Sequence, residues 1–254
     1  MKILCFIQTD DGAVNPVSKE AIALSQELRD KSNGSLDILT FDQQAASQLN
    51  QYDSNKVLIG NSSELADYNP LYYTSAVDHI LNSNDYDLLV IAHTYQARDW
   101  VPRLSARQDI PFISDCIDYS MEGDSIEWIR SLYRAKINSQ LKSKSKKTII
   151  SIQSGCFKID NIKAGESEIS TIDIDLSKVE KTIMPGEKFK ESGSQIDLTS
   201  SDVIISIGRG IGKEENIPMA KELSDLTGGL LASSRPVVDS GWLDHSLQIG
   251  SSGQ

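Results

Sequence analysis

Short apolar runs alternate with amphipathic stretches through the first 115 residues. Nearly continuous apolar runs predict buried strands at 2–8, 36–41, 56–59 and 86–92. Apolar residues at helical spacing predict helices from Ser18 to the Asn33-Gly34 pair, and at 44–50, 71–81 and about 98–108. Strands and helices that alternate at this interval are typical of βαβ units, so we expect an α/β fold with a mostly parallel sheet.

The pattern changes after residue 116. Strands are predicted at 126–133, 135–141 and 148–153, with no helix between them. The loop 142–147 carries four lysines (142, 144, 146 and 147), and we expect it to be the solvated tip of a hairpin; a docking patch is the alternative. Residues 166–179 are predicted to form a polar, strand-like arm without an obvious partner in the chain.

A second domain is predicted after a linker. Residues 185–201 are rich in Gly, Ser, Lys and Glu, which is typical of a linker, and this places an N-terminal domain at 1–184 and a smaller domain at 202–254. The apolar run 202–207 predicts a strand, 214–227 a helix that ends at Gly228-Gly229, and 230–232 a further strand.

Composition excludes several classes of protein. The 254 residues include 36 acidic and 25 basic ones, a net charge of −11, which disfavours nucleic-acid binding. No apolar run reaches the ~18–20 residues of a membrane span, and Ile3–Ile7 is too short for a signal peptide. The three cysteines lack C-x-x-C spacing and the three histidines lie far apart, so we expect a cytoplasmic protein with reduced thiols and no metal site.

The candidate chemistry lies at the ends of the last strands. Gly208-Arg209-Gly210-Ile211-Gly212 stands between a strand and a helix, where glycines let backbone N–H groups approach a phosphate. Because position 213 is Lys, the frame is G-x-G-x-G, and a tight turn without a ligand is the alternative. Ser233-Ser234-Arg235 ends the next strand, so two arginines at one sheet edge indicate an anionic nucleotide; two surface arginines without a role are the alternative.

A third segment supplies further donors. Gln248-Ile249-Gly250-Ser251-Ser252-Gly253-Gln254 places two glycines around two hydroxyl groups, which suits a polar ring or a phosphate. A disordered tail is the alternative reading of these residues.

The chain resembles the alpha subunit of the electron transfer flavoproteins. Residues 203–211 are similar to that family's strand and G-R-G loop, and residues 232–242 (ASSRPVVDSGW) and 247–253 (LQIGSSG) are similar to two later blocks. Looser similarity extends to Pro102-Arg103-Leu104, to residues 111–115 and to Arg130-x-x-Tyr133. The resemblance therefore covers nearly the whole chain and is most specific in its last 55 residues or so.

This resemblance implies a fold and a function. It implies an N-terminal, nucleotide-binding-like domain similar to adenine-nucleotide hydrolases, and a doubly wound C-terminal domain that holds FAD. It also implies pairing with a beta subunit that often carries AMP, and electron transfer from flavin dehydrogenases, such as the acyl-CoA dehydrogenases of fatty acid beta-oxidation, to a quinone reductase. Such a protein is an electron carrier rather than an enzyme with its own substrate.

The resemblance also implies roles for single residues. Arg209 and Ser234 would contact the phosphate side of FAD, and Arg235 would lie beside the isoalloxazine ring. Gln248 and the segment from Ile249 through Gly250 and Ser251 to Ser252 would wrap the edge of the ring, with Ser252 in place of the family's Thr near flavin N5. We identify no catalytic residue.

Departures from the family pattern leave alternatives open. Ser251 replaces the usual Gln, and Gln254 replaces a Lys. The family continues for several tens of residues after this block, so the FAD-binding domain is expected to be incomplete in this chain and to hold FAD weakly by itself. An NAD-binding oxidoreductase domain and a flavin-free structural paralogue are the alternatives, although Ser233-Ser234-Arg235 lacks the acidic residue that would hold an NAD ribose.

Overall fold

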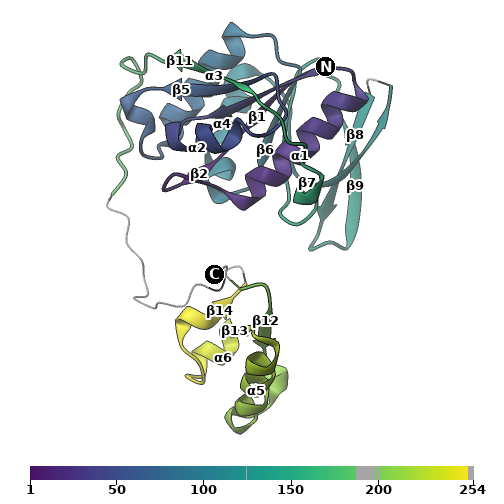
Figure 1. Cartoon of the computed structure of the whole chain (residues 1–254), viewed down its shortest axis with the longest axis vertical. Coiled ribbons are helices and arrows are strands. Elements are labelled where there is room, and N and C mark those ends of the chain that lie inside the picture. Colours follow the sequence, from purple (N-terminus) through teal and green to yellow (C-terminus); the bar gives the residue numbers. More distant parts are fainter. Residues whose placement is uncertain (124, 187–197, 199–200, 251–254) are drawn as a thin grey trace. The chain divides into compact units, whose positions relative to one another are not determined.

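The computed structural model describes residues 1–123, 125–186, 198 and 201–250, and divides the chain into two compact units, Met1–Pro185 and Gly186–Gln254 (Figure 1). Most of the expected linker, 185–201, lies outside the described residues. No helix among the described residues is long and apolar enough to cross a membrane.

A nine-stranded sheet organises the N-terminal unit. Its spatial order is β11-β5-β4-β1-β6-β10-β7-β8-β9. Every neighbouring pair from β11 to β7 is parallel, whereas β7–β8 and β8–β9 are antiparallel. The strands are β1 (Lys2–Phe6), β4 (Ser35–Thr40), β5 (Lys56–Asn61), β6 (Leu88–Ala92), β7 (Phe112–Glu122), β8 (Ser125–Leu132), β9 (Ile137–Lys142), β10 (Thr148–Ile152) and β11 (Glu168–Asp173). The expected mostly parallel α/β sheet is therefore confirmed.

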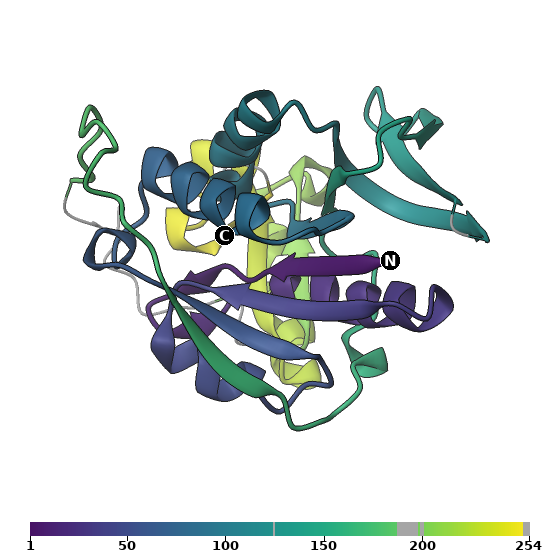
Figure 2. The same ribbon diagram turned by 90° about the horizontal axis from the view of Figure 1, so that it is seen from above.

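Helices cover both faces of this sheet, which explains the unbroken apolar runs of its central strands. Helices α1 (Pro16–Lys31) and α2 (Gln43–Leu49) pack on one face, and α3 (Pro70–Ser83) and α4 (Tyr95–Gln108) on the other (Figure 2). The side chains of β1 alternate between the two faces of the sheet. Ile3 and Cys5 belong to the core under α1, and Leu4 and Phe6 belong to the core under α3 and α4. A small hairpin, β2 (Thr9–Asp10) and β3 (Ala13–Val14), precedes α1.

Two helices begin at least two residues earlier than the apolar spacing predicts. Helix α1 starts at Pro16 rather than Ser18, because the Asn15 side chain accepts a hydrogen bond from Val17 N at 3.0 Å. Helix α4 starts at Tyr95 rather than about Arg98, because Thr94 Oγ1 accepts from Ala97 N at 3.1 Å. In both cases a polar capping residue sets the start of the helix. Such a residue is not part of the apolar pattern, so the pattern places the start too late.

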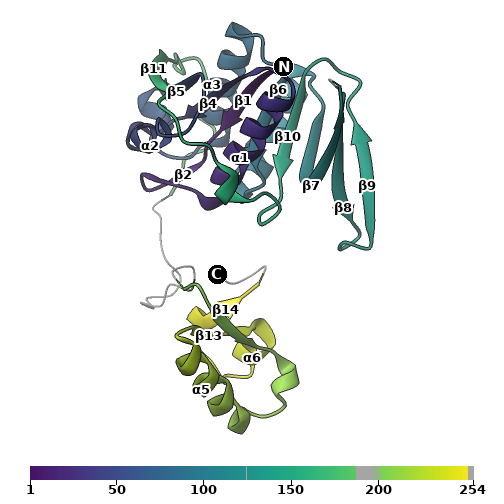
Figure 3. The same cartoon turned by 45° about the vertical axis from the view of Figure 1, so that its right-hand side comes forward.

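The lysine-rich loop is not the tip of a hairpin, contrary to expectation. The strands on either side of it, β9 and β10, do not pair with each other: β9 pairs with β8, and β10 lies between β6 and β7 (Figure 3). The loop therefore crosses from one edge of the sheet toward its centre. Strand β10 is rich in isoleucine, which suits a central position, and it is buried along its whole length. Strand β9 is polar and largely exposed, which suits the edge of the sheet.

The polar arm at 166–179 has a partner within the chain, which corrects the expectation that it has none. Residues Glu168–Asp173 form β11, which extends the sheet in parallel with β5 over six residue pairs. After the strand, Ile174 and Leu176 are 5% and 3% exposed in the core under α3. The backbone pairing and these two side chains fix the arm to the unit.

The C-terminal unit contains a three-stranded parallel sheet in the order β12-β13-β14. Its strands are β12 (Ile204–Ile207), β13 (Leu230–Ser234) and β14 (Gln248–Ile249), and its helices are α5 (Ile217–Thr227) and α6 (Arg235–Asp239). Residues Ile207, Ala220, Leu231 and Val237 form a small buried core between the sheet and the helices. Gly229 is required at the start of β13, because a Cβ there would lie 2.6 Å from the Val203 carbonyl oxygen.

Candidate functional site

The carboxyl ends of β12, β13 and β14 lie together at one edge of the C-terminal sheet. Ile207 pairs with Ser233, and Ser233 pairs in turn with Gln248. Because all three strands run in the same direction, the segments that follow them are neighbours in space. The structure thus places the glycine loop, the Ser234–Arg235 pair and the Gln248–Gly250 segment at this edge.

The glycine loop forms a single tight turn. Ile211 N donates to Gly208 O at 3.0 Å, and Gly212 N donates to Arg209 O at 3.1 Å. Gly212 has a φ of +82°, which favours glycine, and a Cβ on Gly210 would meet nothing within 4 Å. Because the first N–H groups of such a turn precede its own hydrogen bonds, the backbone at 209–210 is open to an approaching group. The Arg209 side chain is exposed beside it.

The residues at the end of β13 face this loop. A Cβ built on Gly208 would lie 3.5 Å from Ser234 Oγ, so the two residues are in van der Waals reach. Arg235 is the first residue of α6, and its Nε lies 3.5 Å from Asp239 Oδ2. Both side chains of this pair are more than 60% exposed, so water screens the attraction and the guanidinium is accessible to a ligand.

The third predicted segment, 248–254, begins with strand β14. Gln248 is buried with Ser233 as its neighbour, Ile249 pairs with Ser234, and Gly250 follows with a φ of +107°. Ser251 and Ser252, the remaining predicted site residues, lie outside the described residues.

Ser233 is a polar residue that sequence reasoning did not single out as a contact. Its side chain is 0% exposed, and its Oγ has no hydrogen-bond partner among the described residues. A buried hydroxyl without a partner is uncommon and marks a place where a further group is expected. The sequence gives no reason to treat Ser233 differently from Ser234. In the structure they differ because successive side chains of β13 point to opposite faces of the sheet, so that Ser233 is buried and Ser234 is only partly buried.

The N-terminal sheet has a different carboxyl edge, which its own side chains occupy. Thr94 Oγ1 donates to Gln8 Oε1 at 2.5 Å, linking the ends of β6 and β1 where the strand order reverses. Beside them, His93 Nδ1 lies 2.8 Å from Ser151 Oγ, which accepts from Asp115 N at 3.1 Å. Burial lowers the pKa of His93, so its imidazole is neutral at pH 7. Sequence reasoning missed this cluster, since its residues come from four separate segments.

Glycine loops and exposed cations at the carboxyl edge of a parallel sheet are typical of α/β proteins that bind phosphate-containing cofactors. The family comparison is specific. A family model described as an electron transfer flavoprotein domain matches residues 3–177, and one described as an electron transfer flavoprotein FAD-binding domain matches residues 197–254. The chain belongs to the electron transfer flavoprotein family and is of its alpha type.

Curated relatives agree with this assignment. The electron transfer flavoprotein subunit alpha of Bacillus subtilis is 26% identical over 100% of this chain and 78% of its own length. The corresponding subunit of Methylophilus methylotrophus is 28% identical over 100% of this chain and 79% of its own. The lactate dehydrogenase (NAD(+),ferredoxin) subunit LctC of Acetobacterium woodii is 24% identical over 99% of this chain and 62% of its own.

The residues at the edge of the C-terminal sheet fit a flavin dinucleotide. The open backbone at Gly210 and the exposed Arg209 suit a diphosphate, and the Ser233 hydroxyl, unpartnered among the described residues, can donate to or accept from a polar group. FAD supplies the redox chemistry when bound, while the protein supplies binding, orientation and local charge.

Proposed function

We propose that this chain holds FAD at the carboxyl edge of β12, β13 and β14 and carries electrons between a flavin dehydrogenase and a membrane quinone reductase. The observation that supports this most is the convergence of three segments, 208–212, 234–235 and 248–250, at one sheet edge inside the region matched by the FAD-binding family model. Arg209 and Ser234 are assigned to the phosphate side, and Arg235 to the ring.

An NAD-binding site is less well supported at this edge. In NAD-binding sheets an acidic residue at the end of the second strand holds the ribose hydroxyls. Here β13 ends in Ser233 and Ser234 and is followed by Arg235, a cation in place of the acid. The carboxylate that would bind the ribose hydroxyls of NAD is therefore missing from the end of this strand.

The proposed partner is an electron transfer flavoprotein beta subunit, with AMP in that subunit. The relatives from Bacillus subtilis and Methylophilus methylotrophus are named as subunits, and the Acetobacterium woodii relative is named as a subunit of a dehydrogenase. Acyl-CoA dehydrogenases of fatty acid oxidation are the proposed donors, and the cytoplasm is the proposed location.

The test is co-expression of the chain with a beta subunit from the same organism. We expect a heterodimer in sedimentation and the visible absorption bands of bound flavin. Arg209→Ala should weaken FAD binding at least tenfold, whereas Lys221→Ala, which removes a cation paired with Asp225 on α5, should leave it unchanged. A colourless heterodimer, or equal losses in the two variants, would argue for the flavin-free alternative.

A further inference from the structure

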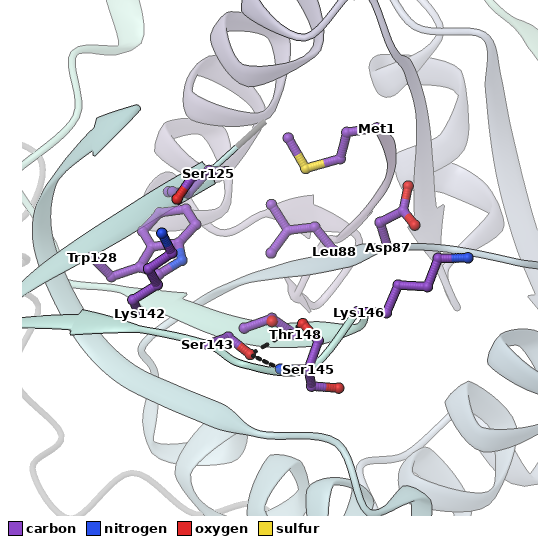
Figure 4. A pocket seen from close by; sticks show the side chains of 11 residues that line it. Met1, Asp87, Leu88, Ser125, Trp128, Lys142, Ser143, Ser145, Lys146 and Thr148 are labelled. Carbon is purple, nitrogen blue, oxygen red and sulfur yellow. Dashed lines mark hydrogen bonds between the residues drawn. The ribbon is translucent and has the colours of Figure 1, made fainter. Parts of the chain in front are cut away.

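The N-terminal unit contains a pocket at the opposite, amino edge of its sheet, with a volume of about 590 Å³. Leu88 and Thr148, the first residues of β6 and β10, form its inner wall, together with Met1 before β1. Strands β8 and β9 and the loop between β9 and β10 form the outer wall. Figure 4 shows Trp128 and Lys142 on one side of the pocket and Asp87 and Lys146 on the other. A volume of this size is in the ordinary range for small-molecule sites.

The floor of the pocket is apolar and belongs to the core of the unit. Trp128 and Leu88 are 2% and 3% exposed, and Met1 and Ile126 pack against the same core cluster. Trp128 and Leu88 therefore support the floor from below, while the half-buried Met1 and Ile126 supply the apolar surface that faces the pocket.

The rim of the pocket carries two exposed lysines, Lys142 and Lys146. Among the described residues, neither Lys142 nor Lys146 has a carboxylate within 4.0 Å. Of the nearby acids, Asp85 pairs with Lys147 at 3.1 Å, whereas Asp87 lines the pocket, accepts a hydrogen bond from the backbone Lys2 N at 2.8 Å and keeps its negative charge. In a chain with a net charge of −11, this is a local excess of positive charge beside a cavity.

Hydroxyl groups complete the rim. The loop is shaped by its own serines, since Ser145 N donates to Ser143 Oγ at 3.1 Å and Lys147 N donates to Ser145 Oγ at 3.4 Å. These bonds, seen in part in Figure 4, fix the backbone between the two lysines. Ser125 and Thr148 add further hydroxyls to the lining.

We propose that this pocket binds an organic phosphate that carries a flat ring, with the phosphate at the lysine-bearing rim and the ring against the half-buried side chains of Met1 and Ile126. Lysine ammonium groups and hydroxyl donors suit phosphate oxygens, and an apolar floor suits the face of a ring. The site is separate from the proposed flavin site, because it lies wholly within Met1–Pro185 and uses none of residues 208–250. It also gives the lysine-rich loop a role that a solvated turn would not have.

The test is a titration of the full-length chain, labelled with ¹⁵N, with uridine monophosphate as the probe. Uridine and inorganic phosphate, the two halves of the probe, are titrated separately. We expect uridine monophosphate to bind at least tenfold more tightly than either half, and to shift amide signals at both 125–128 and 142–148. A pyrimidine is chosen because an adenine nucleotide is one half of FAD.

Matched variants separate this pocket from general charge attraction. Lys142→Ala combined with Lys146→Ala should weaken uridine monophosphate binding at least tenfold. Lys144→Ala removes one positive charge from the same loop, at a position that does not line the pocket, and should change the affinity less than twofold, whereas Lys142→Ala and Lys146→Ala made singly should each weaken binding by more than that. The proposal is overturned if the whole probe binds no better than its halves, if the shifts fall in 208–250, or if Lys144→Ala weakens binding as much as the double variant.

Discussion

At the scale of single residues, polar groups at strand ends distinguish the two units. At the end of β13 stand the exposed guanidinium of Arg235 and the buried Ser233 hydroxyl, which has no hydrogen-bond partner in the part of the chain that the structure describes. At the end of β6, Thr94 is hydrogen-bonded to Gln8 and His93 to Ser151. The first set is prepared for a ligand, whereas the second set is satisfied within the protein. This contrast is why the proposed cofactor site lies in the smaller unit.

Arg235→Ala should lower the first one-electron potential of bound FAD in the heterodimer. A cation in contact with the ring favours added negative charge, by about 1 kcal/mol for a unit charge at about 4 Å in water, or roughly 40 mV. The value for water applies because the side chain is 67% exposed. Arg235→Lys should recover part of the shift, since a point charge cannot lie flat on a ring. Redox titration decides the matter: an unchanged potential with flavin retained would assign Arg235 a purely structural role.

The cysteines should differ sharply in reactivity. Burial raises the pKa of Cys5 and Cys116 to about 12, so both remain protonated thiols well above pH 8, and both are inaccessible. Cys156 is partly exposed, although burial raises its pKa as well. With a thiol-specific disulfide reagent at pH 8, we expect slow reaction at Cys156 in the folded chain and reaction of all three after denaturation. Cys156→Ser should abolish the native-state reaction, and any fast second thiol would contradict this assignment.

At the scale of elements, the sequence predicts the helices and buried strands that have a regular apolar pattern. It does not predict which strands pair with each other. The strands at β1, β4 and β6 and the helices α1, α3 and α4 are visible because burial on one face or two imposes a regular pattern. The pairing of β11 with β5 rests on backbone hydrogen bonds, and its polar, exposed side chains give no such signal. The three site segments are visible in order along the chain, but their convergence depends on the parallel register of β12, β13 and β14.

The arm that carries β11 offers a matched pair of isoleucines. Ile174 is 5% exposed beneath α3 and α4, whereas Ile169, in the strand itself, is 39% exposed. We expect Ile174→Ala to lower the free energy of unfolding by about 2–5 kcal/mol, through lost burial and the cavity left behind. Ile169→Ala should cost less than about 1 kcal/mol. Urea denaturation measures both, and similar values for the two variants would indicate that the arm is not docked as described.

At the scale of the whole molecule, the two units differ in how much they bury. The N-terminal unit has two large clusters of buried residues on either side of a nine-stranded sheet. In the C-terminal unit the described residues form one small apolar cluster with four buried members, and large apolar side chains are exposed, including Leu226 at 78% and Met219 at 67%. The larger unit therefore holds the contacts that a stable fold requires.

A fragment of residues 1–185 should fold by itself. It contains every strand of the large sheet and both of its cores, so we expect cooperative unfolding in urea and dispersed amide signals like those of the same residues in the full chain. A control fragment of residues 1–147 lacks β10 and β11 and should not fold, because β10 separates β6 from β7. A disordered 1–185 fragment, or a folded control, would contradict this division of the chain.

The central place of β10 has a consequence for biosynthesis. Strand β6 is complete at residue 92 and β7 pairs with β10 from residue 112 onward, yet β10 itself ends only at residue 152. At about 5–20 residues per second, the 60 residues from 92 to 152 take roughly 3–12 s to translate. During that interval the nascent chain presents a fully apolar strand, Leu88–Ala92, with one side of its backbone unpaired. Such an edge pairs readily with another chain, so we expect ribosome-bound chains that end before residue 152 to crosslink to chaperones more strongly than longer ones, and equal crosslinking at both lengths would contradict this.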